Sequence, residues 1–194
     1  MQIFINSLTL SRIIFAPVIF ICIVHWQYFG FAILLFIFAS ISDFFDGYLA
    51  RRYKLTSELG RILDPIADKV LVAFALVAIA LHLNSILIGL GTSVIISREL
   101  WVSALREMNA IQGNINATKV TFLAKIKTTI QLVSISGYTL SFYLNSSILE
   151  FLSHFALLLA IIITLKTGLE YSLLSFIHKV GSSDDPSQSI HSKN

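Results

Sequence analysis

Long apolar segments alternate with short polar connections along most of the chain. Each segment runs for about 17–25 residues, the length that a helix needs to cross a bilayer. Six are recognisable: Leu8–Tyr28, Phe31–Ala50, Ile62–Leu81, Ile86–Leu105, Val120–Leu144 and Leu149–Leu169, the last of which could continue to Ile177. The pattern therefore predicts an all-α integral membrane protein, a bundle of six transmembrane helices.

The composition agrees with this prediction and excludes the usual soluble classes. Hydrophobic residues make up 56% of the 194 residues and charged residues only 13%, and the mean hydropathy is +0.81. Soluble domains carry about twice that charged fraction. We expect one membrane domain over residues 1–180 and a polar, disordered tail over residues 181–194, where Ser and Asp are frequent. A single cysteine, Cys22, excludes an internal disulfide.

All lysines and arginines fall on one side of the predicted topology. The connections near Trp26–Gly30, His82–Ser85 and Asn145–Ser147 carry none, whereas all fourteen lie at the start of the first helix, around the alternate connections, or in the last helix and the tail. Positively charged connections stay in the cytoplasm. Both termini and the charged end of the bundle are therefore predicted to be cytoplasmic.

Four aspartates interrupt the second and third apolar segments in a fixed pattern. The pattern reads Asp43-x2-Asp46-Gly47-x2-Ala50-Arg51-x8-Gly60-x3-Asp64-x3-Asp68. Each aspartate at membrane depth costs on the order of 2.5–3.5 kcal/mol on insertion scales. Four of them in one helical hairpin need a compensating cation.

The spacing of the aspartates indicates what that cation is. Asp43 and Asp46 are three residues apart and Asp64 and Asp68 four apart, so each pair shares one helix face. A short connection makes the two helices antiparallel neighbours, and the pairs can converge. Oxygen ligands without nearby His or Cys select Mg²⁺ or Mn²⁺. Four carboxylates suit two such ions, the arrangement that assists displacement at phosphorus.

The other residues of the pattern fit a phosphate ligand beside these metals. Glycines at 47 and 60 let the backbone approach a ligand closely, and Ala50 leaves the same face open. Arg51 can orient a diphosphate through two parallel hydrogen bonds. The alternative is that the acids are charges at loop ends and the arginines only anchor the helices at the membrane surface.

This pattern resembles the signature of the CDP-alcohol phosphatidyltransferases, with all eight signature residues in register. The resemblance implies that an alcohol attacks the β-phosphorus of a CDP-linked lipid and that CMP leaves. It also implies that Asp43, Asp46, Asp64 and Asp68 hold two metals, with Asp68 the base for the acceptor hydroxyl. The implied CDP-binding positions are Gly47, Ala50, Arg51, Ser57 and Gly60. Ser57 replaces the threonine usual there, which leaves its role with the cytidine open.

Further motifs resemble those family members that make phosphatidylglycerol phosphate. These motifs are Asn6-x2-Thr9-x2-Arg12, Ile96–Glu99, Ala104–Glu107 and Lys125-x-Lys127-Thr128-x2-Gln131, with Ala124 where a glycine is frequent. The resemblance implies CDP-diacylglycerol and glycerol 3-phosphate as substrates. It also implies a homodimer in the bacterial inner (plasma) membrane, in contact with membrane lipid and without a nucleic-acid partner.

Four cations near the cytoplasmic ends of the fourth and fifth helices are candidates for binding the acceptor phosphate. They are Arg98, Arg106, Lys125 and Lys127. Buried cations beside a metal site suit a second phosphate, as in glycerol 3-phosphate. The alternative is an ordinary belt of cations that contacts lipid headgroups.

Two rival functions remain at this point. The same chemistry could use another acceptor: serine, inositol phosphate or phosphatidylglycerol. A divalent-cation transporter could use the aspartates as its ion site, but transporters often show paired half-repeats. This chain has one acidic cluster, with no counterpart in its other half.

Overall fold

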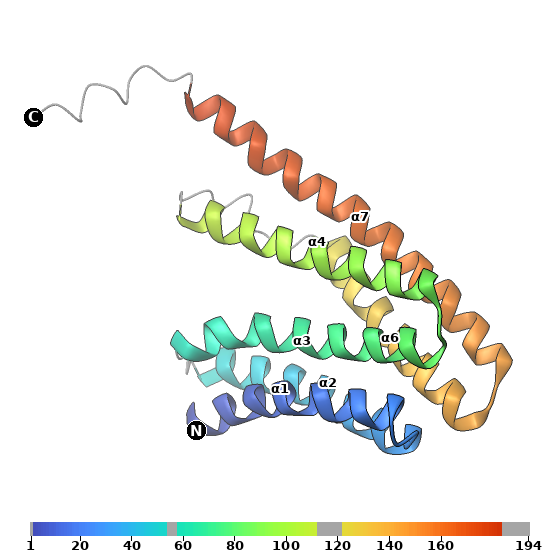
Figure 1. The fold of residues 1–194 in the computed structure, drawn as a ribbon. Helices are drawn as coiled ribbons and strands as arrows, with labels where there is room; N and C mark the ends of the chain where they lie inside the picture. The colour runs from blue at the N-terminus through green and yellow to red at the C-terminus, as the bar shows by residue number, and fades with distance from the viewer. Residues whose placement is uncertain (1, 54–57, 112–121, 184–194) are drawn as a thin grey trace, which may run out of the picture.

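The computed structural model describes residues 2–53, 58–111 and 122–183, and side chains for residues 9–42, 63–111 and 122–175. The described residues form six helices joined by short turns or by segments outside the description (Figure 1). The helices are α1 (Gln2–Val24), α2 (Phe29–Tyr53), α3 (Glu58–His82), α4 (Ile86–Ile111), α6 (Phe122–Leu144) and α7 (Ser147–Ser183). The predicted all-α fold with six helices is confirmed.

Helices α1, α2 and α3 form one half of the bundle, and α4, α6 and α7 form the other. Helix α3 joins the halves through its contacts with α4 and α6, and α2 also contacts α6; within the halves, α1 contacts α2 and α3, and α7 contacts α4 and α6. The turns that join α1 to α2, α3 to α4 and α6 to α7 lie together at one end of the bundle (Figure 1). The start of α1, the end of α2 and the start of α3 lie at the opposite end. This arrangement separates the charge-free turns from the positively charged helix ends.

Three helices are long and apolar enough to cross a membrane within the described residues: Leu63–His82, Ile86–Ile111 and Ser147–Ser175. Two shorter apolar helical segments, Thr9–Val24 and Phe29–Ser42, accompany them. Many large apolar side chains of α7 are exposed, among them Phe151, Leu158 and Leu169. Such a surface is compatible with lipid and not with water. The protein is an integral membrane protein, and the crossing of all six helices stays a prediction.

An Asn-Ser dipeptide forms two of the three turns. Asn84 and Asn145 have positive φ values of 47° and 50°, a backbone conformation that asparagine tolerates better than most residues. The next residue, Ser85 or Ser146, donates its N–H to a carbonyl of the finished helix at 3.0 Å. Its hydroxyl then accepts an N–H from the first turn of the following helix. Each dipeptide thus ends one helix and caps the next.

Small residues bring α1, α2 and α3 close together. The buried core of this half contains Ala16, Ala32, Ala39, Ala75 and Ala78, each with no exposed surface. Alanine lets helix backbones approach closely, which favours van der Waals contact where lipid gives no hydrophobic driving force between helices. The close approach of α1 to α3 is what positions the site described below.

Helices α6 and α7 pack closely at Gly137. A Cβ added to Gly137 would lie 2.4 Å from Ser153 Oγ, whereas one added to Gly89 in α4 would meet nothing within 4 Å. We expect Gly137→Ala to lower the thermal unfolding midpoint in detergent, with an overpacking cost of about 1–3 kcal/mol. Gly89→Ala should leave the midpoint unchanged or raise it, because alanine favours helices by up to about 1 kcal/mol.

The second change Ser153→Ala removes the clashing oxygen and leaves a contact at 3.5 Å. It should restore the midpoint of Gly137→Ala. A Gly137→Ala protein as stable as Gly89→Ala would contradict the packing of α6 on α7.

Candidate active site

A buried arginine of α1 holds two aspartates of α3. Arg12 Nη1 donates to Asp68 Oδ1, and Arg12 Nη2 lies 3.5 Å from Asp64 Oδ1. Thr9, one turn earlier on the same face of α1, donates its hydroxyl to Asp64 Oδ1 at 2.6 Å. Thr9 and Arg12 share one face of α1, and Asp64 and Asp68 share one face of α3. These two faces meet, and the four side chains form one cluster.

The members of this cluster differ sharply in burial. Arg12 and Thr9 have no exposed surface, whereas the side chains of Asp64 and Asp68 are 41% and 47% exposed. The guanidinium therefore lies behind the carboxylates and fixes their orientation, while the carboxylates remain accessible to a ligand. Sequence reasoning missed this role of Arg12, although the shared face of Thr9 and Arg12 was a usable signal.

The donor atoms of Asp64 and Asp68 fit the predicted magnesium or manganese ions. Both are accessible oxygen ligands on one helix face, the ligand type that hard cations prefer. Within the described side chains, no group of three or more metal-ligating residues occurs. The other two predicted ligands, Asp43 and Asp46, belong to the stretch of α2 whose side chains lie outside the description. Four-carboxylate binding therefore stays a prediction.

The predicted CDP-binding residues also fall outside the described side chains. Gly47, Ala50 and Arg51 lie in the last turns of α2, and Gly60 lies in the first turn of α3. Ser57 belongs to residues 54–57, which are not described. Their roles stay predictions from the signature.

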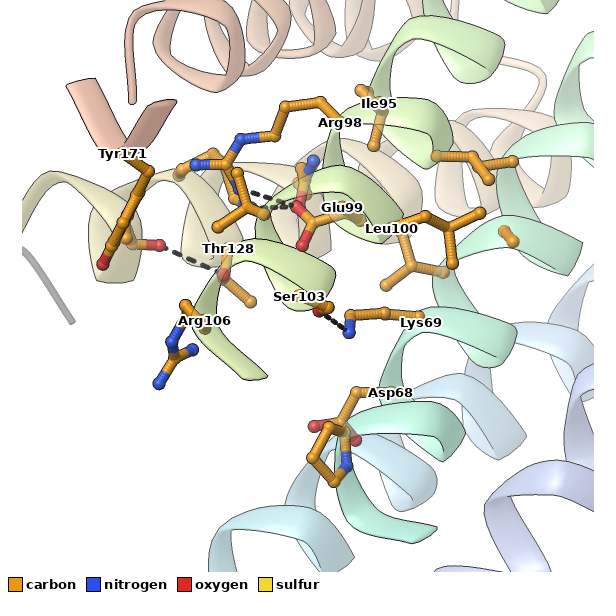
Figure 2. A pocket seen from close by; sticks show the side chains of 18 residues that line it. Asp68, Lys69, Ile95, Arg98, Glu99, Leu100, Ser103, Arg106, Thr128 and Tyr171 are labelled. Atoms are coloured by element: carbon orange, nitrogen blue, oxygen red, sulfur yellow. Dashed lines mark hydrogen bonds and ion pairs between the residues drawn. The ribbon is translucent and has the colours of Figure 1, made fainter. Parts of the chain in front are cut away.

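A pocket of about 260 Å³ opens beside Asp68 and extends between α3, α4, α6 and α7 (Figure 2). Asp68 and Lys69 line it from α3, and Lys127 lines it from α6. Helix α4 contributes most of the remaining charged and polar groups: Arg98, Glu99, Ser103 and Arg106. The pocket thus joins one predicted metal ligand to several of the predicted acceptor cations.

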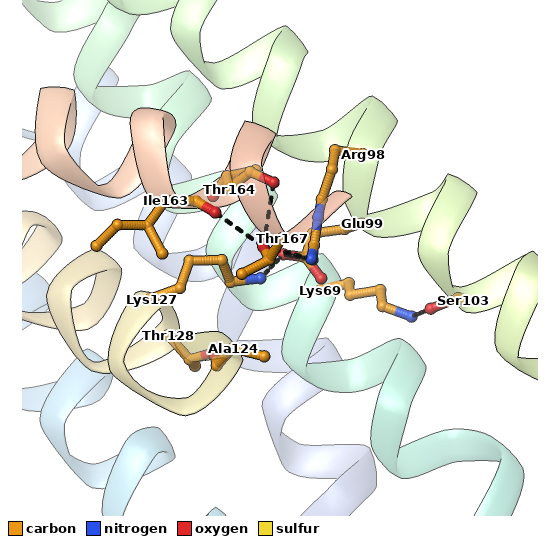
Figure 3. Close-up of polar contacts among 10 residues, drawn as sticks. All are labelled: Lys69, Arg98, Glu99, Ser103, Ala124, Lys127, Thr128, Ile163, Thr164 and Thr167. Carbon is orange, nitrogen blue, oxygen red and sulfur yellow. Dashed lines mark hydrogen bonds and ion pairs between the residues drawn. The ribbon is translucent and has the colours of Figure 1, made fainter. Parts of the chain in front are cut away.

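Two sets of polar contacts hold charged groups of the pocket, one around Glu99 and one at Lys69 (Figure 3). Glu99 Oε1 accepts a hydrogen bond from Lys127 Nζ and lies 3.4 Å from Arg98 Nη1. Arg98 Nη2 also donates to Thr167 Oγ1 at 2.6 Å. Lys69 Nζ, one residue after Asp68, donates to Ser103 Oγ. These contacts tie α4 to α3, α6 and α7 around the pocket.

Arg98 lies where it does because α7 carries a glycine opposite it. A Cβ on Gly168 would approach Arg98 Cγ to 2.9 Å and Nε to 3.3 Å. The side chain is 8% exposed, and its Nε has no hydrogen-bond partner among the described residues. Gln131, which lines the same pocket, also has a buried amide nitrogen without such a partner. Two buried donors of the pocket residues thus lack a partner among the described residues.

The structure brings three of the four predicted acceptor cations to this pocket. Arg98 and Lys127 are buried, and Arg106 is exposed at the pocket edge. Lys125 is exposed and is not among the lining residues described. Residues i and i+2 do not share a helix face, so Lys125 and Lys127 cannot both face the pocket. The prediction for Lys125 thus gains no support from its position.

Several lining residues were not predicted from the sequence. Lys69 counted only as one of the cations at the cytoplasmic end, and no role was assigned to Gln131 or to Tyr171 of α7. The motif Lys125-x-Lys127-Thr128-x2-Gln131 contained a signal for Gln131. It lies four residues after Lys127, on the same helix face.

Comparison with known proteins identifies a family. The family profile described as CDP-alcohol phosphatidyltransferase matches residues 3–166. Proteins named CDP-diacylglycerol–glycerol-3-phosphate 3-phosphatidyltransferase from Escherichia coli (strain K12) and Shigella flexneri serotype 5b (strain 8401) are each 42% identical to the chain. Both matches extend over 132 residues, which is 66% of this chain and 72% of each relative.

The Arg12 cluster gives a direct test of the site geometry. We expect Arg12→Ala to lower the free energy of unfolding by about 2–3 kcal/mol. Removing one partner of a fully buried pair costs roughly 3–5 kcal/mol, and the half-exposed aspartates reduce that cost. Thermal unfolding in detergent measures the loss.

Arg106→Ala is the matched control, because it removes the same charge from an exposed position. Its effect should stay within about 0.5 kcal/mol. Equal midpoints for the two variants would show that Arg12 does not hold α1 to α3.

Proposed function

The chain belongs to the CDP-alcohol phosphatidyltransferase family, and we propose that it transfers the phosphatidyl group of CDP-diacylglycerol to sn-glycerol 3-phosphate. The products are phosphatidylglycerol phosphate and CMP. The names of the relatives at 42% identity support this choice of substrates.

One observation carries the proposal: Asp68 and the cations Arg98, Arg106 and Lys127 line the same pocket. An acceptor with its phosphate against these cations can present its hydroxyl group toward Asp68. A molecule with a phosphate at one end and a hydroxyl at the other, such as glycerol 3-phosphate, matches both ends. Charge-assisted hydrogen bonds from arginine and lysine to phosphate are among the stronger polar contacts in proteins.

The proposed reaction uses these groups in fixed roles. Arg98, Arg106 and Lys127 bind the phosphate and orient the acceptor. Asp68 accepts the proton of the attacking hydroxyl, as a positioned carboxylate can. The acceptor oxygen forms a bond to the β-phosphorus while the bond from that phosphorus to the CMP oxygen breaks. Arg12 and Thr9 hold Asp64 and Asp68 in place throughout.

Two divalent ions complete the proposed site. Asp64 and Asp68 would hold them together with Asp43 and Asp46. When bound, such ions neutralise the diphosphate and the charge that builds on the leaving CMP. Gly47, Ala50, Arg51, Ser57 and Gly60 are the proposed contacts of the CDP group.

The proposed placement in the membrane follows the charge distribution. We propose six membrane-crossing helices within one domain over residues 1–180, a tail over residues 181–194, and a homodimer. Both termini and the active site would face the cytoplasm of a bacterial inner membrane, because lysine and arginine collect at that end. The family membership leaves no role for the alternative of an ion transporter.

An acceptor panel tests the proposed reaction. Purified protein with CDP-diacylglycerol and Mg²⁺ should release CMP with sn-glycerol 3-phosphate and not with serine or glycerol, which lack the phosphate. Chelation should stop the release, and Mg²⁺ or Mn²⁺ should restore it. Asp68→Asn should abolish it, because an amide cannot accept the proton. Release with serine but not with glycerol 3-phosphate would refute the proposed acceptor.

Two lysines of α6 provide a matched pair for the phosphate site. We expect Lys127→Met to raise the KM for glycerol 3-phosphate about ten- to a hundredfold, the value of one charge-assisted hydrogen bond. Its KM for CDP-diacylglycerol should change only slightly.

The control Lys125→Met removes the same charge two residues away, on the exposed face. Its KM for glycerol 3-phosphate should match the wild-type value. If Lys125→Met and Lys127→Met raise the KM equally, the cations act as a general surface belt and not as a pocket.

A further inference from the structure

Glu99 is an acidic side chain among the cations that are proposed to bind the acceptor phosphate. Its Oε1 atom accepts from Lys127 Nζ and lies 3.4 Å from Arg98 Nη1. The side chains of Lys127 and Arg98 are only 4% and 8% exposed. One carboxylate oxygen therefore binds two nearly buried cations from two helices (Figure 3).

The charges that line the pocket explain why a carboxylate lies there. Four described lining residues are cationic, namely Lys69, Arg98, Arg106 and Lys127, and two are acidic, Glu99 and Asp68. Asp68 is already in contact with Arg12 of α1. Buried cations without a nearby anion are unfavourable in a low-dielectric interior. Glu99 thus supplies the compensating negative charge next to Lys127 and Arg98.

We propose that Glu99 is an internal substitute for the acceptor phosphate, which must displace it from Lys127 and Arg98 to bind. This inference rests on the proposed function, because it takes the acceptor phosphate to bind these two cations. The Glu99 side chain is 22% exposed, whereas both cations are nearly buried. The carboxylate is thus the most exposed of the three charged groups and lines the open pocket, whereas the cations are held by the packing around them.

This exchange makes Glu99 a specificity-determining residue. A phosphate replaces one carboxylate with a group of equal or greater negative charge and three acceptor oxygens. A neutral acceptor such as glycerol would leave Lys127 and Arg98 without an anion if it displaced Glu99. A neutral acceptor is therefore at a disadvantage, because it cannot replace the ion pairs that Glu99 makes with Lys127 and Arg98.

If Glu99 has a different role, its removal changes the affinity for phosphate in the opposite direction. If the carboxylate instead orients Lys127 and Arg98 for the phosphate, its removal weakens phosphate binding. If it occupies the phosphate position, its removal strengthens phosphate binding. In both cases the protein without ligand loses stability, so stability alone does not separate the two roles.

The experiment measures binding of sn-glycerol 3-phosphate to the full-length protein in detergent, without CDP-diacylglycerol, from the ligand-dependent rise in the thermal unfolding midpoint. We expect Glu99→Gln to unfold at a lower temperature than wild type without ligand. Its apparent Kd for sn-glycerol 3-phosphate should fall about tenfold, the effect of one competing charge-assisted contact. An unchanged or higher Kd would overturn the proposal.

Glu107→Gln is the matched control. Glu107 follows Arg106 as Glu99 follows Arg98, but it is exposed and is not among the lining residues described. Its Kd should equal that of wild type, and a tenfold decrease there would assign the effect to bulk charge and overturn the proposal.

Glu99→Asp covers the case in which Glu99→Gln does not fold. It keeps the charge but draws the carboxylate back by one methylene, so the Kd should still fall, by about two- to fivefold. An unchanged Kd for this variant would also overturn the proposal. Failure of the wild-type protein to release CMP with glycerol 3-phosphate would instead reject the proposed function, which separates the two tests.

Discussion

A charge inside an apolar helix bundle needs an opposite charge beside it, and the site of this protein is built from that requirement. Arg12, Arg98 and Lys127 are nearly or fully buried, and each one is in contact with a carboxylate. Because removal of one partner leaves the other uncompensated, these contacts fix the relative positions of the helices that carry them. The arrangement of the bundle and the chemistry of the site thus have the same physical origin.

Helix α3 links the two groups of charges. Asp68 contacts Arg12 of α1 on one side and lines the pocket formed with α4 on the other. Lys69, the next residue, contacts Ser103 of α4. The proposed metal site and the proposed acceptor site therefore adjoin each other at α3. The hydroxyl of a bound acceptor can then lie near Asp68, the proposed base. Movement of α3 against α1 or α4 would disturb both sites together.

Much of the fold could be predicted because apolar periodicity and charge distribution are local properties. The six helices and the convergence of Asp64 and Asp68 on one face followed from spacing alone. The lengths of the helices did not follow from spacing. Helix α3 begins at Glu58 and helix α7 ends at Ser183. Both ends lie beyond the predicted apolar segments, because polar residues near a bundle end still favour helix. For the turns at Asn84 and Asn145, the sequence-based prediction used only the absence of lysine and arginine.

The site was predicted only in part, because sequence spacing does not say which face of a helix meets which neighbour. Lys125 and Lys127 were both predicted to bind the acceptor phosphate, yet of these two only Lys127 is among the lining residues described. Arg12 was recognised only as part of an N-terminal motif, yet it is fully buried and binds Asp68 of α3. Thr167 and Gly168, the residues of α7 that lie against Arg98, are about seventy positions away from it in sequence. Tertiary packing decided all three cases.

The most direct measurement is an experimental structure of the protein with Mn²⁺ and sn-glycerol 3-phosphate bound. We expect manganese beside Asp64 and Asp68, identified by its anomalous scattering. The phosphate should lie against Arg98 and Lys127, with the acceptor hydroxyl directed at Asp68 and Glu99 turned away. A phosphate bound outside this pocket, or manganese remote from both aspartates, would contradict the shared site.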